Sequence, residues 1–129
     1  MIVLDAWAIM ALLKKEPAGP RVQRAVDEVD VAISAINLGE SQYVLTKEGR
    51  DAPTVEAAME LLRRTIRVDL PDWPLVRAAA RIKGARALSY ADAFCVATAQ
   101  RHRAALWTGD PEILALEDLV DVVDLRDAP

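Results

Sequence analysis

The stretch Ile2-Val3-Leu4-Asp5 decides how this sequence is expected to fold. Three aliphatic residues, two of them β-branched, end on a carboxylate and are followed at once by a helix-like segment, residues 8–15. A short apolar run of this kind is typical of a strand buried on both faces of a parallel sheet. Asp5 would then lie at the carboxyl end of a central strand, the edge where open α/β sheets bind ligands.

Helical and strand-like segments alternate along the rest of the chain. Strands are predicted at 31–33, 67–70 (an edge strand), 105–107 and 119–123, and a loose tail at 124–129. Capping residues and first-turn prolines predict helices that begin at Pro20, Ser34, Asp51, Asp72 and Ser89, and a short helix at 113–116. Gly84 and Arg103 are expected to close the last two of the capped helices. This alternation predicts an α/β fold with a mostly parallel sheet.

Length and composition indicate one soluble domain spanning residues 1–129. The chain is 53% hydrophobic, but its apolar runs fall well short of the ~20 residues that a membrane span needs. It shows no basic secretion leader, and its single cysteine, Cys95, suits a reducing cytoplasm. A glycine-rich phosphate loop, a CxxC pair and a G-x-S-x-G motif are all missing, which leaves nucleotide-cofactor and serine-hydrolase functions unsupported.

Four carboxylates occur where an ordinary fold would accept other residues: Asp5, Glu40, Asp92 and Asp110. Strand ends and helix faces can converge in such a sheet, and clustered like charges are unfavourable unless cations bind them. Carboxylates in this number suggest a hard divalent ion, Mg²⁺ or Mn²⁺. Such ions activate water and polarise phosphoryl groups, which points to phosphodiester hydrolysis. The formal charge of −4 does not argue against RNA, since bound cations would cancel it.

Each acid also has a simpler explanation. Asp110 before Pro111 has the form of a helix N-cap followed by a first-turn proline. Asp92 could stabilise a helix dipole, and Asp5 could be a solvated strand end. Glu40 is the hardest to explain in this way, because it lies on the apolar side of its predicted helix.

Other conspicuous side chains favour structural roles. His102, near a helix C-terminus, is expected to be a dipole-compensating or surface residue, and Cys95 a small core residue. Trp7, Trp73 and Trp107 are expected to be packing or interface anchors.

Four segments together resemble the PIN-domain ribonucleases, and within them the VapC-type toxins of toxin–antitoxin pairs. They occur in the family's order and spacing: Ile2-Val3-Leu4-Asp5-Ala6, Ser34-Ala35-Ile36-Asn37-Leu38-Gly39-Glu40, Leu88-Ser89-Tyr90-Ala91-Asp92-Ala93 and Leu106-Trp107-Thr108-Gly109-Asp110-Pro111. The resemblance covers essentially the whole chain. It implies a three-layer α/β/α sandwich, a Mg²⁺-dependent endoribonuclease site (Mn²⁺ as a substitute), a homodimer and inhibition by a cognate antitoxin protein.

Carried over residue by residue, the resemblance makes Asp5, Glu40, Asp92 and Asp110 the catalytic, metal-binding acids. Thr108 matches the family's hydroxyl residue two positions before the last acid, where it can hydrogen-bond a carboxylate. Asn37 is placed to position Glu40 from one turn earlier. One departure concerns the position two after the first acid, where family members often carry a small hydroxyl residue. This chain has Trp7 there, which we expect to line the groove or the dimer interface.

The expected function is therefore that of a cytoplasmic, metal-dependent endoribonuclease, the toxin of a type II toxin–antitoxin system. Its substrate is expected to be single-stranded RNA. The cations that could contact the RNA phosphates are Lys14, Lys15, Arg81, Lys83 and Arg86. The alternative is a non-catalytic PIN-like module whose acids receive a partner's arginine or lysine. Residues 55–62 and the Trp73 segment suit a dimer or antitoxin surface in either case. A receiver domain fits less well, because it needs a neighbouring pair of acids and a late lysine. A haloacid-type phosphatase fits less well, because it needs an acid at the position of Trp7.

Overall fold

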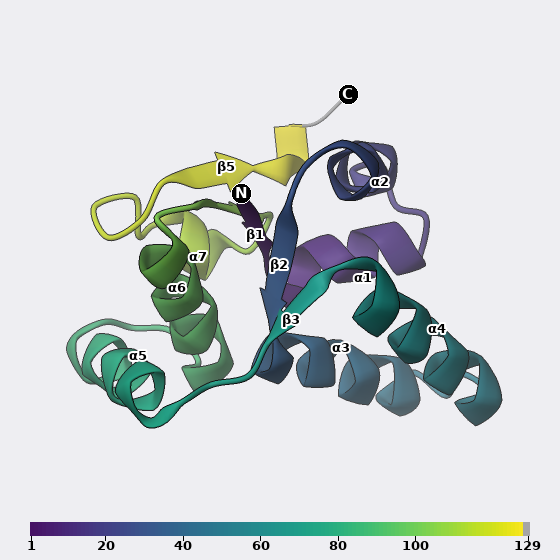
Figure 1. Cartoon of the computed structure of the whole chain (residues 1–129), viewed down its shortest axis with the longest axis horizontal. Coiled ribbons are helices and arrows are strands. Elements are labelled where there is room, and N and C mark those ends of the chain that lie inside the picture. The colour runs from purple at the N-terminus through teal and green to yellow at the C-terminus, as the bar shows by residue number, and fades with distance from the viewer. Residues whose placement is uncertain (128–129) are drawn as a thin grey trace.

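A five-stranded parallel sheet forms the centre of the computed structural model, which describes residues 1–127 (Figure 1). Its strands lie in the order β3-β2-β1-β4-β5. Their bounds are β1 Ile2–Leu4, β2 Val31–Ser34, β3 Arg67–Asp69, β4 Ala105–Thr108 and β5 Val122–Asp124. All four neighbouring pairs are parallel, so the predicted α/β class is confirmed, with β1 at the centre and β3 at an edge.

The helices connect these strands and begin largely at the predicted caps. Their bounds are α1 Ala6–Leu13, α2 Gly19–Glu28, α3 Ala35–Lys47, α4 Ala52–Thr65, α5 Trp73–Ala85, α6 Tyr90–His102 and α7 Pro111–Leu114. The side chains of Ser34, Asp51, Asp72 and Ser89 each accept a hydrogen bond from a backbone N–H of the helix that follows. All of these helices are too short or too polar to serve as membrane-spanning segments.

Alternate residues of the central strands divide the core into two layers. Val3 and Ala32 pack with α5, α6 and α7, whereas Leu4 and Ile33 pack with α1, α2, α3 and α4. Figure 1 shows these two groups of helices on opposite sides of the sheet. The period-two geometry of a strand gives each face its own apolar set, and this produces the expected three-layer α/β/α sandwich.

Several boundaries differ from the sequence-based expectation. The first helix begins two residues earlier, because Asp5 itself caps it, and the short helix begins at Pro111 rather than at residue 113. Helix α5 passes Gly84 and ends at Ala85. The last strand begins at Val122, three residues later than predicted.

The predicted loose tail was wrong for residues 124–127. Asp124 belongs to β5, and a 3₁₀-helix follows at Leu125–Asp127. Leu125 is only 1% exposed and packs in the same layer as Leu4. The buried leucine explains why this segment is held against the sheet. Residues 128 and 129 lie outside the described part of the chain.

Candidate active site

Asp5 lies at the carboxyl edge of the central strand, where it begins α1. Its Oδ1 accepts a hydrogen bond from the Ala8 N–H at 2.9 Å, and its Oδ2 accepts one from the Thr108 hydroxyl. The second contact follows from the register, since Leu4 of β1 pairs with Trp107 of β4. Asp5 is only 2% exposed, so it is not a solvated strand end.

Thr108 connects the first acid to the last one. While its hydroxyl donates to Asp5, its oxygen accepts the Asp110 N–H at 2.9 Å. Asp110 in turn caps α7, because its Oδ1 accepts the Glu112 N–H at 2.9 Å. The expected N-cap role of Asp110 is confirmed, and it coexists with a position in the acidic cluster.

Asp92 reaches the same edge from α6. It lies in the first turn of that helix, where its backbone N–H donates to the Ser89 hydroxyl at 3.1 Å, and its side chain is buried. The amide of Asn37 donates to the Ala91 carbonyl at 3.0 Å, so α3 is fixed against the start of α6. One turn after Asn37, α3 carries Glu40.

Two buried oxygen atoms at this junction have no hydrogen-bond partner within residues 1–127: Oδ1 of Asn37 and Oε1 of Glu40. An unpaired polar atom inside a protein is costly. These two atoms are therefore available to a ligand that can donate a hydrogen bond or carry positive charge.

The carboxylates converge. Oxygen atoms of Asp92, Asp110 and Glu112 lie within 4.8 Å of one another. The charges of the four predicted acids also act on the buried Cys95 thiol. Burial raises the pKa of Cys95 well above its usual value, and the negative charges of Asp5, Asp92, Glu40 and Asp110 raise it further.

Burial among like charges also disfavours ionisation of the acids themselves. Burial raises the pKa of Asp5 from 3.8 to about 7, and the charges of Asp92 and Asp110 add to the rise. For Asp92, burial and then the Asp110 charge raise the pKa from 3.8 to about 7. Burial and the Asp110 charge also raise the pKa of Glu40. Without a cation the cluster therefore binds protons near neutral pH.

These residues fit a hard divalent cation. The available donors are carboxylate oxygens, which Mg²⁺ and Mn²⁺ prefer, and within residues 1–127 no lysine or arginine forms a salt bridge with any of the four predicted acids. Carboxylates brought together without basic partners need positive charge from elsewhere.

Sequence reasoning missed Glu112. It is exposed on α7, two residues after Asp110, and the signal that could have found it is its place in the first turn of a helix that Asp110 caps. Asn37 was expected to position Glu40, and a side-chain hydrogen bond from Asn37 lowers the pKa of Glu40 against the larger, opposite effect of burial. The Asn37 amide also donates to the Ala91 carbonyl, which joins α3 to α6.

Three other expectations were settled by the packing. His102 is not simply a surface residue, because its Nε2 contacts the Asp69 carboxylate and both side chains are 14% exposed. Cys95 is a core residue, as predicted. Trp7 is half-buried and packs among the residues of the α1–α4 layer, with its ring against Gly109.

Comparisons with known proteins agree with this arrangement. The family model described as PIN domain matches residues 2–119. The crystal structure of FitAcB from Neisseria gonorrhoeae is 25% identical, with a TM-score of 0.72 and coverage of 98% of this chain and 99% of that one. A toxin–antitoxin complex from Klebsiella pneumoniae is 20% identical, with a TM-score of 0.71 and coverage of 97% and 98%.

A third similar structure is VapC20 of Mycobacterium tuberculosis, described as a toxin that cleaves the sarcin–ricin loop. It is 20% identical, with a TM-score of 0.71 and coverage of 90% of this chain and 95% of that one. A search of curated protein sequences gave no match. Since the family model spans nearly all of the sheet and every helix that carries an acid, the chain belongs to the PIN-domain family.

Proposed function

We propose that this protein is a Mg²⁺-dependent endoribonuclease and the toxin of a type II toxin–antitoxin pair. The observation that carries the proposal is the convergence of carboxylates at the carboxyl edge of the sheet, of which Asp5 and Asp92 are buried, with no basic residue of residues 1–127 paired to the four predicted acids. Membership of the PIN family and similarity to a sarcin–ricin-loop-cleaving toxin support a ribonuclease.

In this proposal some of the acids bind the cation and another positions the attacking water. Bound Mg²⁺ supplies Lewis acidity for phosphodiester hydrolysis. Asp92, Asp110 and Glu112 hold the cation, and Asp5 adds a carboxylate whose orientation is fixed by Thr108. The unpaired Oε1 of Glu40 accepts a hydrogen bond from the attacking water. Attack at an RNA phosphate leaves a 5′-phosphate and a 3′-hydroxyl.

The substrate strand needs cations near this edge of the sheet. The C-terminal end of α5 leads through a short loop to Ser89, the cap of the helix that carries Asp92. Arg81 and Lys83 on α5 are therefore the cations we propose for the RNA backbone. Arg86, by contrast, already pairs with Asp118 at 2.8 Å.

Lys14 and Lys15 are poorly placed for the same task. They follow the C-terminus of α1, nine and ten residues after Asp5, which corresponds to about 13 Å or more along the helix axis. Lys14 also pairs with Glu48 at 3.1 Å. We therefore leave both lysines out of the proposed RNA-binding surface.

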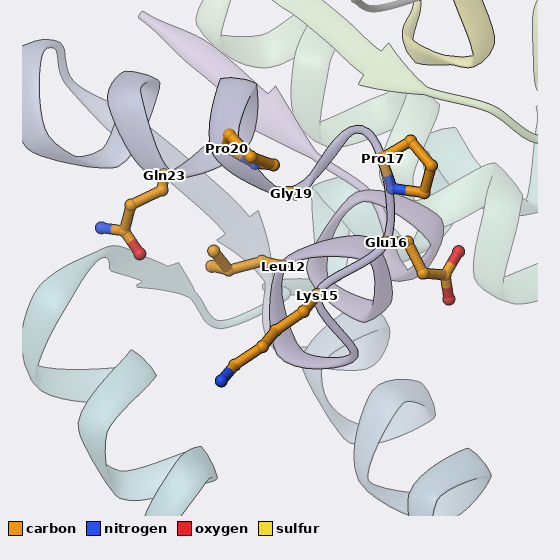
Figure 2. Close-up of a pocket in the computed structure, with 7 residues that line it drawn as sticks. All are labelled: Leu12, Lys15, Glu16, Pro17, Gly19, Pro20 and Gln23. Carbon is orange, nitrogen blue, oxygen red and sulfur yellow. The ribbon is translucent and has the colours of Figure 1, made fainter.

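An antitoxin is the proposed protein partner, because one similar structure is a toxin–antitoxin complex. A cleft of about 520 Å³ opens between α1 and α2 (Figure 2). A second cleft of about 410 Å³ shares Leu12 and Gln23 with it and continues to α4, where Leu61 is 60% exposed. We propose that an apolar segment of the antitoxin binds along these clefts.

A homodimer is proposed through a different surface. Leu70 and Trp73, between β3 and α5, are 78% and 69% exposed. Large apolar side chains so exposed are typical of interfaces. Analytical ultracentrifugation of the wild-type chain and a Trp73→Ser variant tests this surface, since the variant should shift toward monomer.

The experiment that tests the catalytic proposal is cleavage of mixed single-stranded RNA by the purified, partner-free protein. The reaction is run with Mg²⁺, with Mn²⁺ and with chelator, and the wild-type chain is compared with Asp92→Asn. Asp121→Asn is the matched control, because Asp121 is exposed and outside the cluster. We expect metal-dependent cutting that Asp92→Asn loses and Asp121→Asn keeps.

Two outcomes would contradict the proposal. Cleavage by a folded Asp92→Asn variant would mean that the acids are not the site. An absence of both cleavage and any metal-dependent thermal shift in the wild-type protein would favour the alternative, a binding module whose acids receive basic side chains of a partner.

A further inference from the structure

The ring of Trp7 lies against the backbone of Gly109. A Cβ placed on Gly109 would meet Cε2 and Cζ2 of Trp7 at 2.3 Å and Cη2 at 2.6 Å. Real Cβ contacts are never so short, so residue 109 must lack a side chain while Trp7 keeps its place. The requirement is steric and not conformational, because among the glycines only Gly49 has a positive φ within residues 1–127.

This contact joins the two halves of the acidic cluster. Trp7 lies in the first turn of α1, two residues after Asp5, and Gly109 lies between Thr108 and Asp110. The end of β4 and the residue after it are therefore both attached to the start of α1, the first by the hydroxyl of Thr108 and the second by the indole of Trp7.

The two attachments differ in what they can hold. The Thr108 hydroxyl fixes the end of β4, whereas the indole covers the next residue, whose missing side chain would otherwise leave the turn free to shift. The ring itself is anchored, because it packs among the apolar residues of the α1–α4 layer. A bulky, anchored side chain against a glycine limits where the following residue can go.

We propose that Trp7 is a positioning residue: its ring holds the Thr108–Gly109–Asp110 turn so that the Asp110 carboxylate stays beside Asp92. The inference rests on the proposed metal site and adds a residue that does not contact the cation.

The test uses two substitutions whose effects on the affinity for Mn²⁺ should not be additive. Trp7→Leu removes the ring but keeps an apolar residue with good helix propensity. Gly109→Ala introduces the Cβ that collides with the ring. Each is compared with wild type and with the double variant Trp7→Leu/Gly109→Ala. Gly84→Ala is the matched glycine control, because a Cβ there meets nothing within 4 Å.

The main readout is the affinity for Mn²⁺, followed by the electron paramagnetic resonance signal of free Mn²⁺ in the absence of RNA. We expect each single variant to bind Mn²⁺ about tenfold more weakly, the loss typical of changes in residues that support metal ligands. The double variant should be no weaker than Trp7→Leu, since the added Cβ then has no ring to meet. Trp7→Phe, whose shorter ring lacks the Cζ2 and Cη2 atoms that face Gly109, should recover only part of the affinity, and Gly84→Ala should match wild type.

The outcomes separate the inference from the function on which it rests. If wild type binds no Mn²⁺ and cuts no RNA, the metal site and the role of Trp7 both fail. If wild type binds Mn²⁺ and Trp7→Leu binds it equally well, the metal site stands and the positioning role is wrong. Additive losses in the double variant would overturn it too, because the ring and Gly109 would then act separately. If Trp7→Leu does not fold, Trp7→Phe makes the same test, since it lacks the ring atoms that face Gly109, and Mn²⁺ binding equal to wild type by Trp7→Phe would overturn the positioning role.

Discussion

Replacing Asp5 by asparagine should stabilise the metal-free protein at alkaline pH while it weakens the proposed metal site. Asparagine keeps an oxygen for the Ala8 N–H, and its amide can donate to the Thr108 hydroxyl oxygen, so both contacts of Asp5 have a counterpart. What disappears is a charge buried among like charges. The change therefore tests whether the Asp5 carboxylate lowers the stability of the metal-free protein while it contributes to metal binding.

The magnitude follows from the pKa of Asp5. Its pKa is raised by burial from 3.8 to about 7. Because one pKa unit corresponds to about 1.4 kcal/mol, ionised Asp5 costs the folded chain about 4 kcal/mol. A carboxyl with a raised pKa in the folded state stabilises fully below pH 3.8, and this contribution is lost as the pH rises through about 7. Roughly 2 to 3 kcal/mol of that loss falls between pH 5 and pH 8.

The assay is urea unfolding of wild type and Asp5→Asn in chelator at pH 5 and pH 8. Acids with a lowered pKa, such as Asp69 beside His102 and Asp124 beside Arg126, are present in both proteins, so their titration cancels when the two are compared. The free-energy advantage of Asp5→Asn should grow by about 2 to 3 kcal/mol from pH 5 to pH 8.

Asp121→Asn, which changes an aspartate at an exposed position outside the cluster, serves as the control substitution. An advantage of Asp5→Asn that is equal at the two pH values would refute the reasoning. Addition of Mg²⁺ should stabilise wild type more than Asp5→Asn, because cation binding requires ionised carboxylates and the variant has one fewer.

Three further changes test other parts of the structure. Thr108→Val removes the hydroxyl that joins Asp5 to the Asp110 N–H, so cleavage should fall about tenfold or more, whereas Thr108→Ser should retain most of it in the same RNA assay. Glu112→Gln should weaken Mn²⁺ binding measured by titration, and Glu117→Gln, an exposed change on the same segment, should leave it at the wild-type value. Gly19→Ala should lower the melting temperature by several degrees, since the new Cβ would lie 2.8 Å from the backbone oxygen of Ala11, and a calorimetric scan with an unchanged melting temperature would contradict that packing.

Local sequence signals were enough to predict much of the fold. The run Ile2-Val3-Leu4 correctly indicated a central parallel strand, and the caps Ser34, Asp51, Asp72 and Ser89 correctly indicated helix starts, because both depend on neighbouring residues alone. The end of the chain was mispredicted, since its order depends on the burial of Leu125 against distant residues.

For the candidate site, the sequence allowed a prediction of the acidic residues but not of the contacts that hold them in place. Each acid alone had a simpler explanation, and Asp110 is in fact an N-cap as well. The link from Asn37 to the Ala91 carbonyl joins residues 54 positions apart, and nothing local signals it. The same is true of the ring of Trp7 against Gly109, because a pairing of a large with a small residue across two connections becomes visible only when the strands are in register.

The separation along the chain between Asp5 and Thr108 has a consequence for biosynthesis. These residues are 103 positions apart, and β1 acquires its β4 neighbour only after nearly the whole chain exists. At about 5–20 residues per second, a growing polypeptide carries Asp5 for several seconds before Thr108 and Asp110 are made. A nascent chain therefore cannot assemble the acidic cluster, and any harmful activity of the finished protein would begin only after a window in which a partner already present in the cell can reach the emerging helices α1, α2 and α4.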